Sequence, residues 1–553
     1  MLRSPWWPEN EPERLPRLPG TMVDALARAA GSRPDHVATF YYGAAQSYGE
    51  LHRRVLALTV YLRVVCGVRA GDRVVLTMQN APQYVIAFHA ILRADAVIVP
   101  ISPMYRTDEM CHIVEDSGAR IAIIASELIP EVLPIAGTRL DHVIVARYGD
   151  MLPTEQHFET PEVVSDSGPE LPQGAAWHSW HSAMAQEGAP PEALRGPNDL
   201  CILPYTSGTT GKPKACMHTH SAMLYTAVLN ARWFGIDEES VVTAFMPLFH
   251  VAGMQGSMNA AICVGATMVV TTRWNRELIP ALFEAHGVTF WNAAPTMIVD
   301  VLGSPAFSER SFRRLRTIHG GGATMPETVA EALRKRFGLA FIEGYGLTET
   351  MSPTHINPPR RPKPQSLGIP VHETDARVID PDTLRELGPN EIGEIIVHGP
   401  QIMLGYWNRP EANAESFLAI DGKGFLRTGD LGRYDEEGYF YAIDRLKRMI
   451  NVSGYKVWPA EIEAMLYRHP AIRECCVIGA PDSYRGETVM AQIVLRDDFR
   501  EPIEPADIIG WARAHMASYK VPRRVLFVRQ LPRTASNKID WRRLQNGERA
   551  RGE

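Results

Sequence analysis

The chain has 553 residues and a mass of 61.6 kDa, which is too large for one hydrophobic core and predicts two to four domains. Hydrophobic residues make up 45% and charged residues 22%, a balance that excludes disordered, collagen-like and small disulfide-bonded proteins. The formal net charge of -6 excludes a general nucleic-acid coat, because neutralising a phosphate backbone requires a clear basic excess. We therefore expect no nucleic-acid partner.

Cysteine usage and the N-terminal sequence both bear on location. The seven cysteines are scattered and form no CxxC pair, which in a long chain predicts reduced thiols. The N-terminus, MLRSPWWPENEPERLP, has proline, tryptophan and acidic residues where a secretory signal requires an apolar run. We therefore expect a cytoplasmic protein.

From about residue 25 to residue 301, short apolar runs alternate with longer amphipathic stretches, as in GDRVVLTM, APQYVIAFHAILRA and AVIVPI. This alternation predicts βαβ units and largely parallel sheets. Residues 241–272 contain no Asp, Glu, Lys or Arg, and that length can span a bilayer. Pro247 and three glycines interrupt the segment, so we predict a buried strand–helix–strand layer and no transmembrane span.

Two stretches rich in proline, residues 148–198 and 357–370, are predicted to be long connections. After the second, short strands and turns predict a small β-rich subdomain, and residues 458–553 return to helix–strand alternation. The predicted fold class is therefore α/β. A large N-terminal body of βαβ-built sheets, with a small β-rich subdomain, precedes a small α+β C-terminal domain.

Residues 205–214 read YTSGTTGKPK, between a strand-like run and a helix-like stretch that begins near His220. Glycine lets backbone N–H groups approach phosphate oxygens, and hydroxyl side chains add further donors. The spacing differs from a Walker A loop, because two residues separate Gly208 from Gly211 and proline follows Lys212. We predict a phosphate-binding loop in preference to a solvated turn. Its predicted contacts are Thr206, Ser207, Gly208, Thr209, Thr210, Gly211, Lys212 and Lys214.

Three further motifs carry ligand-binding chemistry. HGGGA (319–323) lies between a strand-like run and a helix-like stretch, and its glycines permit close backbone approach. GYGLTET (344–350) offers the Tyr345 ring to a base and the Glu349 carboxylate to Mg²⁺. RTGD (427–430) closes an exposed-looking loop, and Asp430 can accept two ribose hydroxyls. Each motif alone also fits an ordinary turn.

Together and in this order, the motifs resemble those of the adenylate-forming superfamily of acyl- and aryl-CoA synthetases, adenylation domains and luciferases. The chain looks most like a fatty-acid–CoA ligase, and the resemblance covers nearly all of it. It implies that Thr348 contacts the α-phosphate, that Glu349 binds Mg²⁺ and that Lys538 is the mobile catalytic lysine. Asn537 stands where the family usually has glycine. The further implied ATP and AMP contacts are Gly322, Ala323, Glu343, Gly344, Tyr345, Gly346, Asp430 and Arg445.

The resemblance also implies a division into residues 1–446 and a mobile domain of residues 447–553, with its hinge at Lys447. The implied contacts with coenzyme A are Ser453, Gly454, Tyr455 and Arg485.

FHVAG (249–253) resembles the FHxxG segment of the acyl pocket, in which His250 is the implied catalytic residue. Amino-acid-activating relatives place an aspartate in this region, and residues 241–272 offer none, which favours an acid with an apolar body. The predicted pocket residues are His250, Gly253, Trp291, Asn292, Gly320, Leu347 and Met351.

The resulting prediction is an ATP-dependent carboxylic acid–CoA ligase that uses ATP, Mg²⁺ and coenzyme A, with a medium- or long-chain fatty acid as substrate. Alternatives are an aryl or other apolar acid–CoA ligase, an acyl-adenylating enzyme serving a carrier protein, a luciferase-like oxidase and a non-enzymatic nucleotide sensor. Neither Cys216 with His218 and His220, nor Cys475 with Cys476, completes a metal-ligand set, so no transition metal is predicted. A homodimer is a further expectation.

Overall fold

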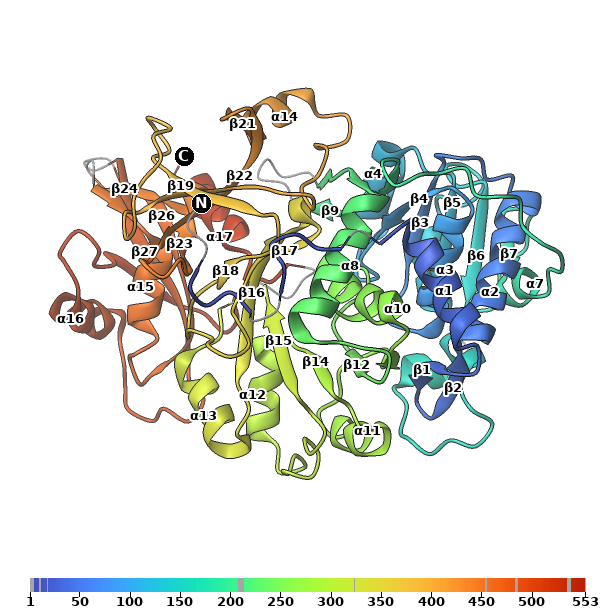
Figure 1. Cartoon of the computed structure of the whole chain (residues 1–553). Helices are drawn as coiled ribbons and strands as arrows, with labels where there is room; N and C mark the ends of the chain where they lie inside the picture. The colour runs from blue at the N-terminus through green and yellow to red at the C-terminus, as the bar shows by residue number, and fades with distance from the viewer. Residues whose placement is uncertain are drawn as a thin grey trace. The chain divides into compact units, whose positions relative to one another are not determined.

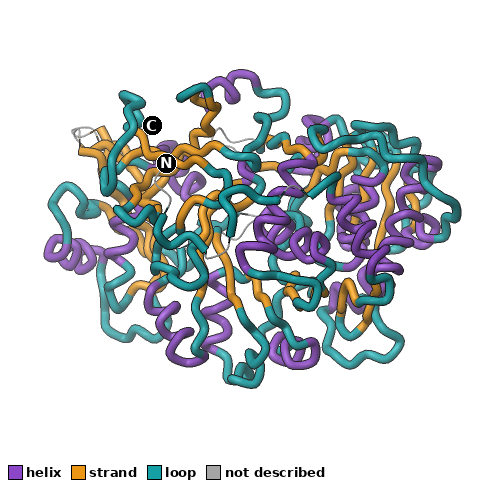
Figure 2. The backbone as a smooth tube through the Cα atoms, in the orientation of Figure 1, coloured by secondary structure: helices purple, strands orange, loops and turns teal. Residues whose placement is uncertain are grey.

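The computed structural model describes residues 4–8, 11–16, 18–166, 168–206, 213–322, 324–452, 455–482, 486–534 and 539–552. The chain divides into two compact units. The first comprises Met1–Ala376, Val397–Leu426 and Glu437–Tyr439, and the second comprises Arg377–Ile396, Arg427–Glu436 and Phe440–Glu553. Both combine helices with strands (Figure 2), as the predicted α/β class requires. The hinge at Lys447 stays a prediction.

A seven-stranded sheet in the first unit follows the order β11-β8-β4-β3-β5-β6-β7. Its neighbours pair in parallel from β8 to β7, and β11 is antiparallel to β8. Every residue of β5 is buried, as expected for a central parallel strand with both faces covered. The strands are β3 (Arg73–Thr77), β4 (Val97–Pro100), β5 (Ile121–Ala125), β6 (His142–Ala146), β7 (Trp177–Ser179), β8 (Leu200–Ile202) and β11 (His218–Thr219).

The segment 148–198, predicted to be only a connection, supplies the edge strand β7 of this sheet and the short helices α6 (Glu162–Ser165) and α7 (Trp180–Met184). Its many prolines and glycines separate these short elements and so masked them in the sequence.

A nine-stranded sheet, also in the first unit, follows the order β18-β17-β16-β15-β14-β12-β13-β1-β2. It is parallel from β16 to β1 and antiparallel at both ends, and Figure 1 shows β12, β14, β15 and β16 side by side. The strands are β1 (Val37–Tyr41), β2 (Ala44–Ser47), β12 (Val241–Ala244), β13 (Thr267–Val270), β14 (Phe290–Asn292), β15 (Thr317–Gly321), β16 (Phe341–Leu347), β17 (Ser352–Ile356) and β18 (Ile369–Pro370).

The charge-free segment 241–272 forms β12, a helical stretch and β13, which confirms the predicted buried layer. The helical stretch consists of α9 (Val251–Gly253), a π-helix at Met254–Asn259 and α10 (Ala260–Val264). Within the described residues, no helix has the length and apolar character needed to cross a bilayer.

Local signals fix where the major helices begin and end. Thr21 caps α1 (Met22–Ser32) and Ser47 caps α2 (Tyr48–Val60), each in a capping box with an acidic residue three positions later. Thr219 caps α8 (His220–Phe234), which ends at Gly235 in the left-handed conformation that glycine favours. The remaining longer helices of the first unit are α3 (Pro82–Arg93), α4 (Thr107–Ser117), α11 (Ile279–His286), α12 (Pro295–Gly303) and α13 (Glu327–Phe337).

The predicted β-rich subdomain is a five-stranded sheet. Its strands are β19 (Asp375–Ile379), β20 (Gly393–His398), β21 (Phe417–Ile420), β22 (Lys423–Tyr434) and β23 (Phe440–Arg445), and α14 (Pro410–Ser416) precedes β21.

The C-terminal part of the second unit is an α+β structure, as predicted. A further five-stranded sheet packs Val477 and Ile493 against Ile462 and Ile508 of its helices. Its elements are β24 (Ile450–Val452), β25 (Tyr455–Val457), α15 (Pro459–Leu466), β26 (Ile472–Asp482), β27 (Gly486–Leu495), α16 (Pro505–His515), β28 (Arg524–Phe527) and α17 (Trp541–Gly552).

Candidate functional site

The two ends of the glycine- and hydroxyl-rich string lie in two short strands. Strands β9 (Tyr205–Thr206) and β10 (Lys214–Ala215) pair antiparallel, with Thr206 opposite Lys214. Thr206 and Lys214 therefore lie opposite each other, on either side of the predicted phosphate-binding residues. The predicted contacts Ser207, Gly208, Thr209, Thr210, Gly211 and Lys212 lie outside the described residues.

The carboxyl ends of three neighbouring parallel strands bring a second group of predicted residues together. Gly320 of β15 pairs with Glu343 of β16, and Gly321 pairs with Gly344. A Cβ atom at Gly320 would lie 1.9 Å from the carbonyl oxygen of Ala293, so only glycine permits this backbone approach. Ligands of open parallel sheets bind at such strand ends. Gly322 follows β15 directly, and Ala323 lies outside the described residues.

Strand β16 extends further than predicted, because it runs through Tyr345 and Gly346 to Leu347 while pairing with β17. Tyr345 lies opposite His355 and is half-buried. A 3₁₀ turn, Thr348–Thr350, follows, and then Met351 and Ser352 both have positive φ values, 47° and 78°. Non-glycine residues in this region are strained, and such strain clusters at functional sites.

Glu343 is a buried carboxylate on β16. Its two oxygens accept hydrogen bonds from the backbone N–H groups of Met325 (2.8 Å) and Gln365 (3.0 Å). Burial raises the pKa of Glu343 to about 7, although the two N–H donors act in the opposite direction. The carboxylate thereby links β16 to the segments that follow β15 and β17.

The turn that contains Thr348 and Glu349 is hydrogen-bonded to the segment that follows the predicted phosphate loop. Nε2 of His218 lies 2.7 Å from the carbonyl oxygen of Thr348. Burial lowers the pKa of His218 to about 4, so the ring is neutral and its Nε2–H donates to that carbonyl.

The hydroxyl of Tyr406 donates to Oε1 of Glu349 at 2.8 Å. The sequence did not indicate Tyr406, because nothing within GYWNRP marks a contact with a carboxylate 57 residues earlier.

The predicted acyl-pocket residues separate into two groups. Nδ2 of Asn292, at the end of β14, donates to the carbonyl oxygen of Ala252 (3.0 Å) and to Oγ of Ser257 (3.2 Å). Asn292 is therefore joined to the segment that contains His250 and Gly253. Within that segment, Nδ1 of His250 accepts a hydrogen bond from the N–H of Ala252. Leu347 is half-buried, and Met351 is fully buried.

Trp291 faces the other way, because successive side chains of a strand alternate between its two faces. Its ring is fully buried and stacks on Trp274 and Phe312, with centroids 5.9 Å and 6.2 Å apart. The structure thus brings Asn292, and not Trp291, to the His250 segment.

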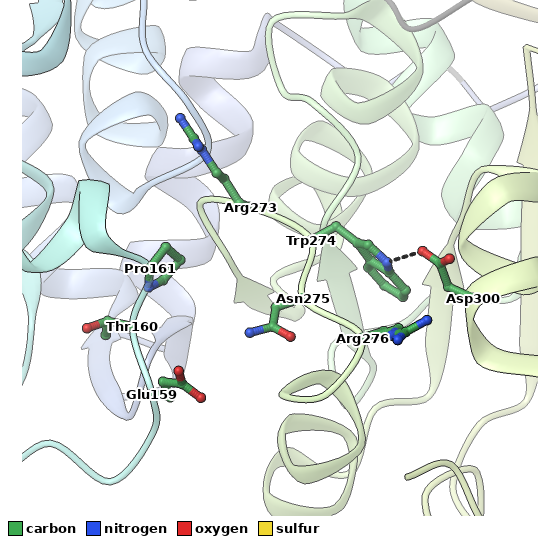
Figure 3. Close-up of a pocket in the computed structure, with 8 residues that line it drawn as sticks. All are labelled: Glu159, Thr160, Pro161, Arg273, Trp274, Asn275, Arg276 and Asp300. Carbon is green, nitrogen blue, oxygen red and sulfur yellow. Dashed lines mark hydrogen bonds between the residues drawn. The ribbon is translucent and has the colours of Figure 1, made fainter. Parts of the chain in front are cut away.

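A cavity of about 500 Å³ opens near Trp274, whose Nε1 donates to Oδ2 of Asp300 at 2.8 Å (Figure 3). Its lining comes from residues 159–161, residues 273–276 and Asp300. Arg273 already faces Glu127 at 3.7 Å, and Arg276 pairs with its neighbour Glu277 at 3.0 Å. None of the described residues predicted for the site is among those that line it.

In the second unit, the RTGD motif occupies a different setting from the one predicted. Residues 427–430 lie inside strand β22, where Thr428 and Asp430 are buried, and not in an exposed loop. The glycine and the polar side chains gave the segment the composition of a loop. Asp430 pairs with Arg445 across β22 and β23, with Arg445 Nε 2.6 Å from Asp430 Oδ1.

Lys447 lies in a 3₁₀ turn, Leu446–Arg448, and Tyr455 begins β25. The predicted residues Ser453, Gly454, Arg485 and Lys538 lie outside the described residues.

A parallel sheet with glycines at its strand ends, a Thr-Glu turn hydrogen-bonded to His218 after the predicted phosphate loop, and an α+β C-terminal part define an adenylate-forming enzyme. Residues 26–407 match the AMP-binding enzyme family, and residues 461–538 match the AMP-binding enzyme C-terminal domain. The chain therefore belongs to the AMP-binding enzyme family.

Its relatives include named CoA ligases. The chain is 34% identical to a long-chain-fatty-acid–CoA ligase of Bacillus subtilis, over 99% of this chain and 98% of the relative. It is also 34% identical to a feruloyl-CoA synthase of Amycolatopsis, over 93% and 96%. The crystal structure of ATP-bound MatB from Rhodopseudomonas palustris superposes with a TM-score of 0.82 at 26% identity, covering 95% of this chain and 98% of that chain.

Proposed function

We propose that the protein is an ATP-dependent carboxylic acid–CoA ligase that works through an acyl-adenylate. One observation carries the proposal: β15 and β16 end side by side in one sheet, and the Thr348–Glu349 turn joins β16 to β17 of that sheet. The turn is hydrogen-bonded to His218, which follows the predicted phosphate loop, and to Tyr406. The names of the two 34% identical relatives, both acid–CoA ligases, support it.

In the proposed first step, an oxygen of the substrate carboxylate attacks the α-phosphorus of ATP. The bond from that phosphorus to the β-phosphate oxygen breaks, and pyrophosphate leaves with the bonding electrons. In the second step, the sulfur of coenzyme A attacks the acyl carbon, AMP leaves and the thiol proton passes to solvent. Neither step requires a covalent bond to the protein, so the residues act by positioning and by stabilising charge.

The proposed roles follow the resemblance of the motifs to those of the adenylate-forming superfamily. The phosphate-loop residues, including Thr206 and Lys214, bind phosphate groups of ATP. Tyr345 stacks on adenine, and Thr348 contacts the α-phosphate. Asp430 binds the ribose, and Arg445 contacts the ribose or a phosphate. Lys538 bridges the substrate carboxylate and the α-phosphate. The backbone contacts are assigned to Gly322, Ala323, Glu343, Gly344 and Gly346.

Glu349 fits a Mg²⁺ ion that accompanies ATP. Mg²⁺ takes oxygen ligands and is held by one or two carboxylates together with substrate phosphates. Glu349 is a half-buried carboxylate with one oxygen engaged by Tyr406. The carboxylate and the phosphates would hold the metal, which neutralises phosphate charge when bound.

The substrate is proposed to be a medium- or long-chain fatty acid, with an aryl acid as the second candidate. The uncharged layer of residues 241–272 supports an apolar acid body and disfavours a free amino acid. The chain is 34% identical to both the fatty-acid and the feruloyl relative. Sequence identity therefore does not distinguish the two substrate classes, and an activity assay with both kinds of acid is needed.

We further propose that residues 447–553 rotate about Lys447 between the two steps and that Ser453, Gly454, Tyr455 and Arg485 contact coenzyme A. The match of residues 461–538 to a separate C-terminal family domain supports this division. A cytoplasmic location and a homodimer stay predictions, which fractionation and size-exclusion chromatography test.

The test is a screen of acids for pyrophosphate release, with short, medium and long fatty acids and aryl acids, each with and without coenzyme A. A ligase releases pyrophosphate and forms an acyl-CoA in stoichiometric amounts when acid, ATP and coenzyme A are all present. An enzyme that serves a carrier protein forms acyl-AMP but no acyl-CoA. An oxidase requires oxygen for product formation, and a nucleotide sensor binds ATP without releasing pyrophosphate.

A further inference from the structure

Residues 403–409 connect two parts of the proposed nucleotide site, the Glu349 turn and the segment after the predicted phosphate loop. The N–H of Met403 donates to the carbonyl oxygen of Glu349 at 2.9 Å. Residues 404–407 run beside residues 215–217, where Leu404 donates to Met217 (2.8 Å) and Trp407 donates to Ala215 (2.9 Å). One short segment therefore joins the Glu349 turn to the chain leaving the phosphate loop.

The backbone of Tyr406 is held from both sides by one amide side chain. Its N–H donates to Oδ1 of Asn413 at 2.6 Å, and its carbonyl oxygen accepts from Nδ2 of Asn413 at 3.0 Å. The preceding Gly405 has a φ of 141°, and a Cβ atom there would meet the Asn413 side chain at 3.0 Å. The position of Tyr406 is thus set independently of its ring.

The Tyr406 side chain meets two residues of the proposed site. Its hydroxyl donates to Oε1 of Glu349 at 2.8 Å. The ammonium of Lys214 lies over its ring, 5.3 Å from the centroid, within the range of a cation–π contact. The hydroxyl engages one carboxylate oxygen of Glu349, and the ring faces the ammonium of Lys214.

We propose that Tyr406 is a positioning residue for metal-bound ATP, which orients the Glu349 carboxylate toward the metal and holds the Lys214 ammonium beside it. The inference rests on the proposed function, in which Glu349 is the Mg²⁺ ligand. Removing a hydrogen-bond partner of a metal ligand typically costs 10- to 100-fold in metal affinity. Tyr406 needs no contact with ATP or with the metal to exert this effect.

The test is the Mg²⁺ dependence of ATP binding, measured by calorimetry at a series of Mg²⁺ concentrations and in EDTA. Tyr406→Phe removes only the hydroxyl. We expect it to raise the Mg²⁺ concentration for half-maximal ATP binding about 10-fold or more, and to leave ATP affinity in EDTA within about twofold. A role confined to packing would not shift the metal dependence while sparing metal-free binding.

Tyr441 provides a matched control. Its hydroxyl donates to Oδ2 of Asp435 at 3.0 Å, and the guanidinium of Arg433 lies over its ring, 4.6 Å from the centroid. Tyr441 thus makes the same two kinds of contact as Tyr406, a hydrogen bond to a carboxylate and a cation–π contact, but with residues outside the proposed site. Tyr441→Phe is expected to bind ATP with the wild-type Mg²⁺ dependence.

Glu349→Gln examines the same hydrogen bond from its acceptor side and separates the inference from the proposed function. We expect Glu349→Gln to raise the Mg²⁺ requirement at least as much as Tyr406→Phe, and the double variant to raise it no further. A wild-type Mg²⁺ dependence in folded Tyr406→Phe, with a shifted one in Glu349→Gln, overturns the inference alone. If Glu349→Gln has no effect, the metal role proposed for Glu349 fails and the inference fails with it.

Discussion

Asp430 of β22 and Arg445 of β23 occupy paired positions on adjacent antiparallel strands, and their side chains form an ion pair 2.6 Å long. The Asp430 side chain is 9% exposed and the Arg445 side chain 47% exposed. Asp430, proposed to bind the ribose, and Arg445, proposed to contact the ribose or a phosphate, therefore already contact each other within the second unit. The carboxylate oxygens of Asp430 are hydrogen-bond acceptors, as contact with ribose hydroxyls requires.

Replacing Asp430 by Asn is expected to weaken ATP binding about 10- to 100-fold, because hydrogen bonds to a charged group are worth about 1.5–3 kcal/mol. The free energy of unfolding should change by about 1 kcal/mol or less, because the guanidinium of the pair is half-exposed to solvent. Calorimetric ATP titration and thermal unfolding measure the two effects. Asp435→Asn, which also alters a carboxylate of the second unit, is the control, and equal losses of ATP affinity in both variants would refute the ribose role.

Glu343 predicts a pH-dependent stability. Its folded pKa of about 7 exceeds the ordinary value of 4.5 because burial disfavours the charged form. The folded protein therefore binds the extra proton between these values, and its stability falls as the pH rises from 4.5 to 7, by about 3 kcal/mol.

Glu343→Gln cannot titrate, so the Tm of the wild type relative to this variant should fall between pH 5 and pH 8. Parallel Tm profiles for the two proteins would show that Glu343 has no raised pKa. Comparing two proteins of the same chain cancels the titration of all other groups.

The buried side chain of His89, also in the first unit, is expected to make the stability of the protein sensitive to acid. It is fully buried in α3, and among the described residues neither ring nitrogen has a hydrogen-bond partner. Burial lowers its pKa from 6.5 to about 3. The stability linked to its neutral form is complete above pH 6.5 and is lost as the pH falls from 6.5 toward 3.

His89→Leu is expected to resist acid better than the wild type, by about 2–3 kcal/mol at pH 4.5, with unchanged activity at pH 7.5. Urea unfolding at both pH values measures the difference. If the variant gains no stability on acidification relative to the wild type, the histidine is protonated or solvated in the folded protein.

Lys538→Ala separates the two half-reactions. The variant is expected to lose adenylation by about 100-fold or more, because a positioned cation stabilises charge that develops at the α-phosphate. Thioester formation from supplied acyl-AMP should be largely retained, and single-turnover assays of each step measure both. Equal losses in both steps would contradict the proposed division of labour.

Patterns local in sequence predicted much of the fold. The charge-free run became the buried layer from β12 to β13, and the glycines of residues 320–322 lie at a strand end. Such patterns predict helices and strands because the periodicity of apolar residues that distinguishes them is found within a few consecutive residues.

Contacts between distant segments were beyond those patterns. The Tyr406–Glu349 hydrogen bond joins residues 57 positions apart, and His218 reaches Thr348 across 130 positions. Both depend on how separate strands and turns are placed by the sheet topology, which residue spacing does not encode. The sequence also did not predict that Asp430 is buried in a strand, because the polar residues and glycine of β22 are typical of a loop.

The most direct test of the central claim is acid-dependent exchange of labelled pyrophosphate into ATP in the absence of coenzyme A. A ligase that forms an acyl-adenylate exchanges the label when ATP, Mg²⁺ and its acid are present, and exchange stops when the acid is omitted. Absence of exchange with every fatty and aryl acid, in a preparation that makes acyl-CoA when coenzyme A is added, would contradict the acyl-adenylate pathway.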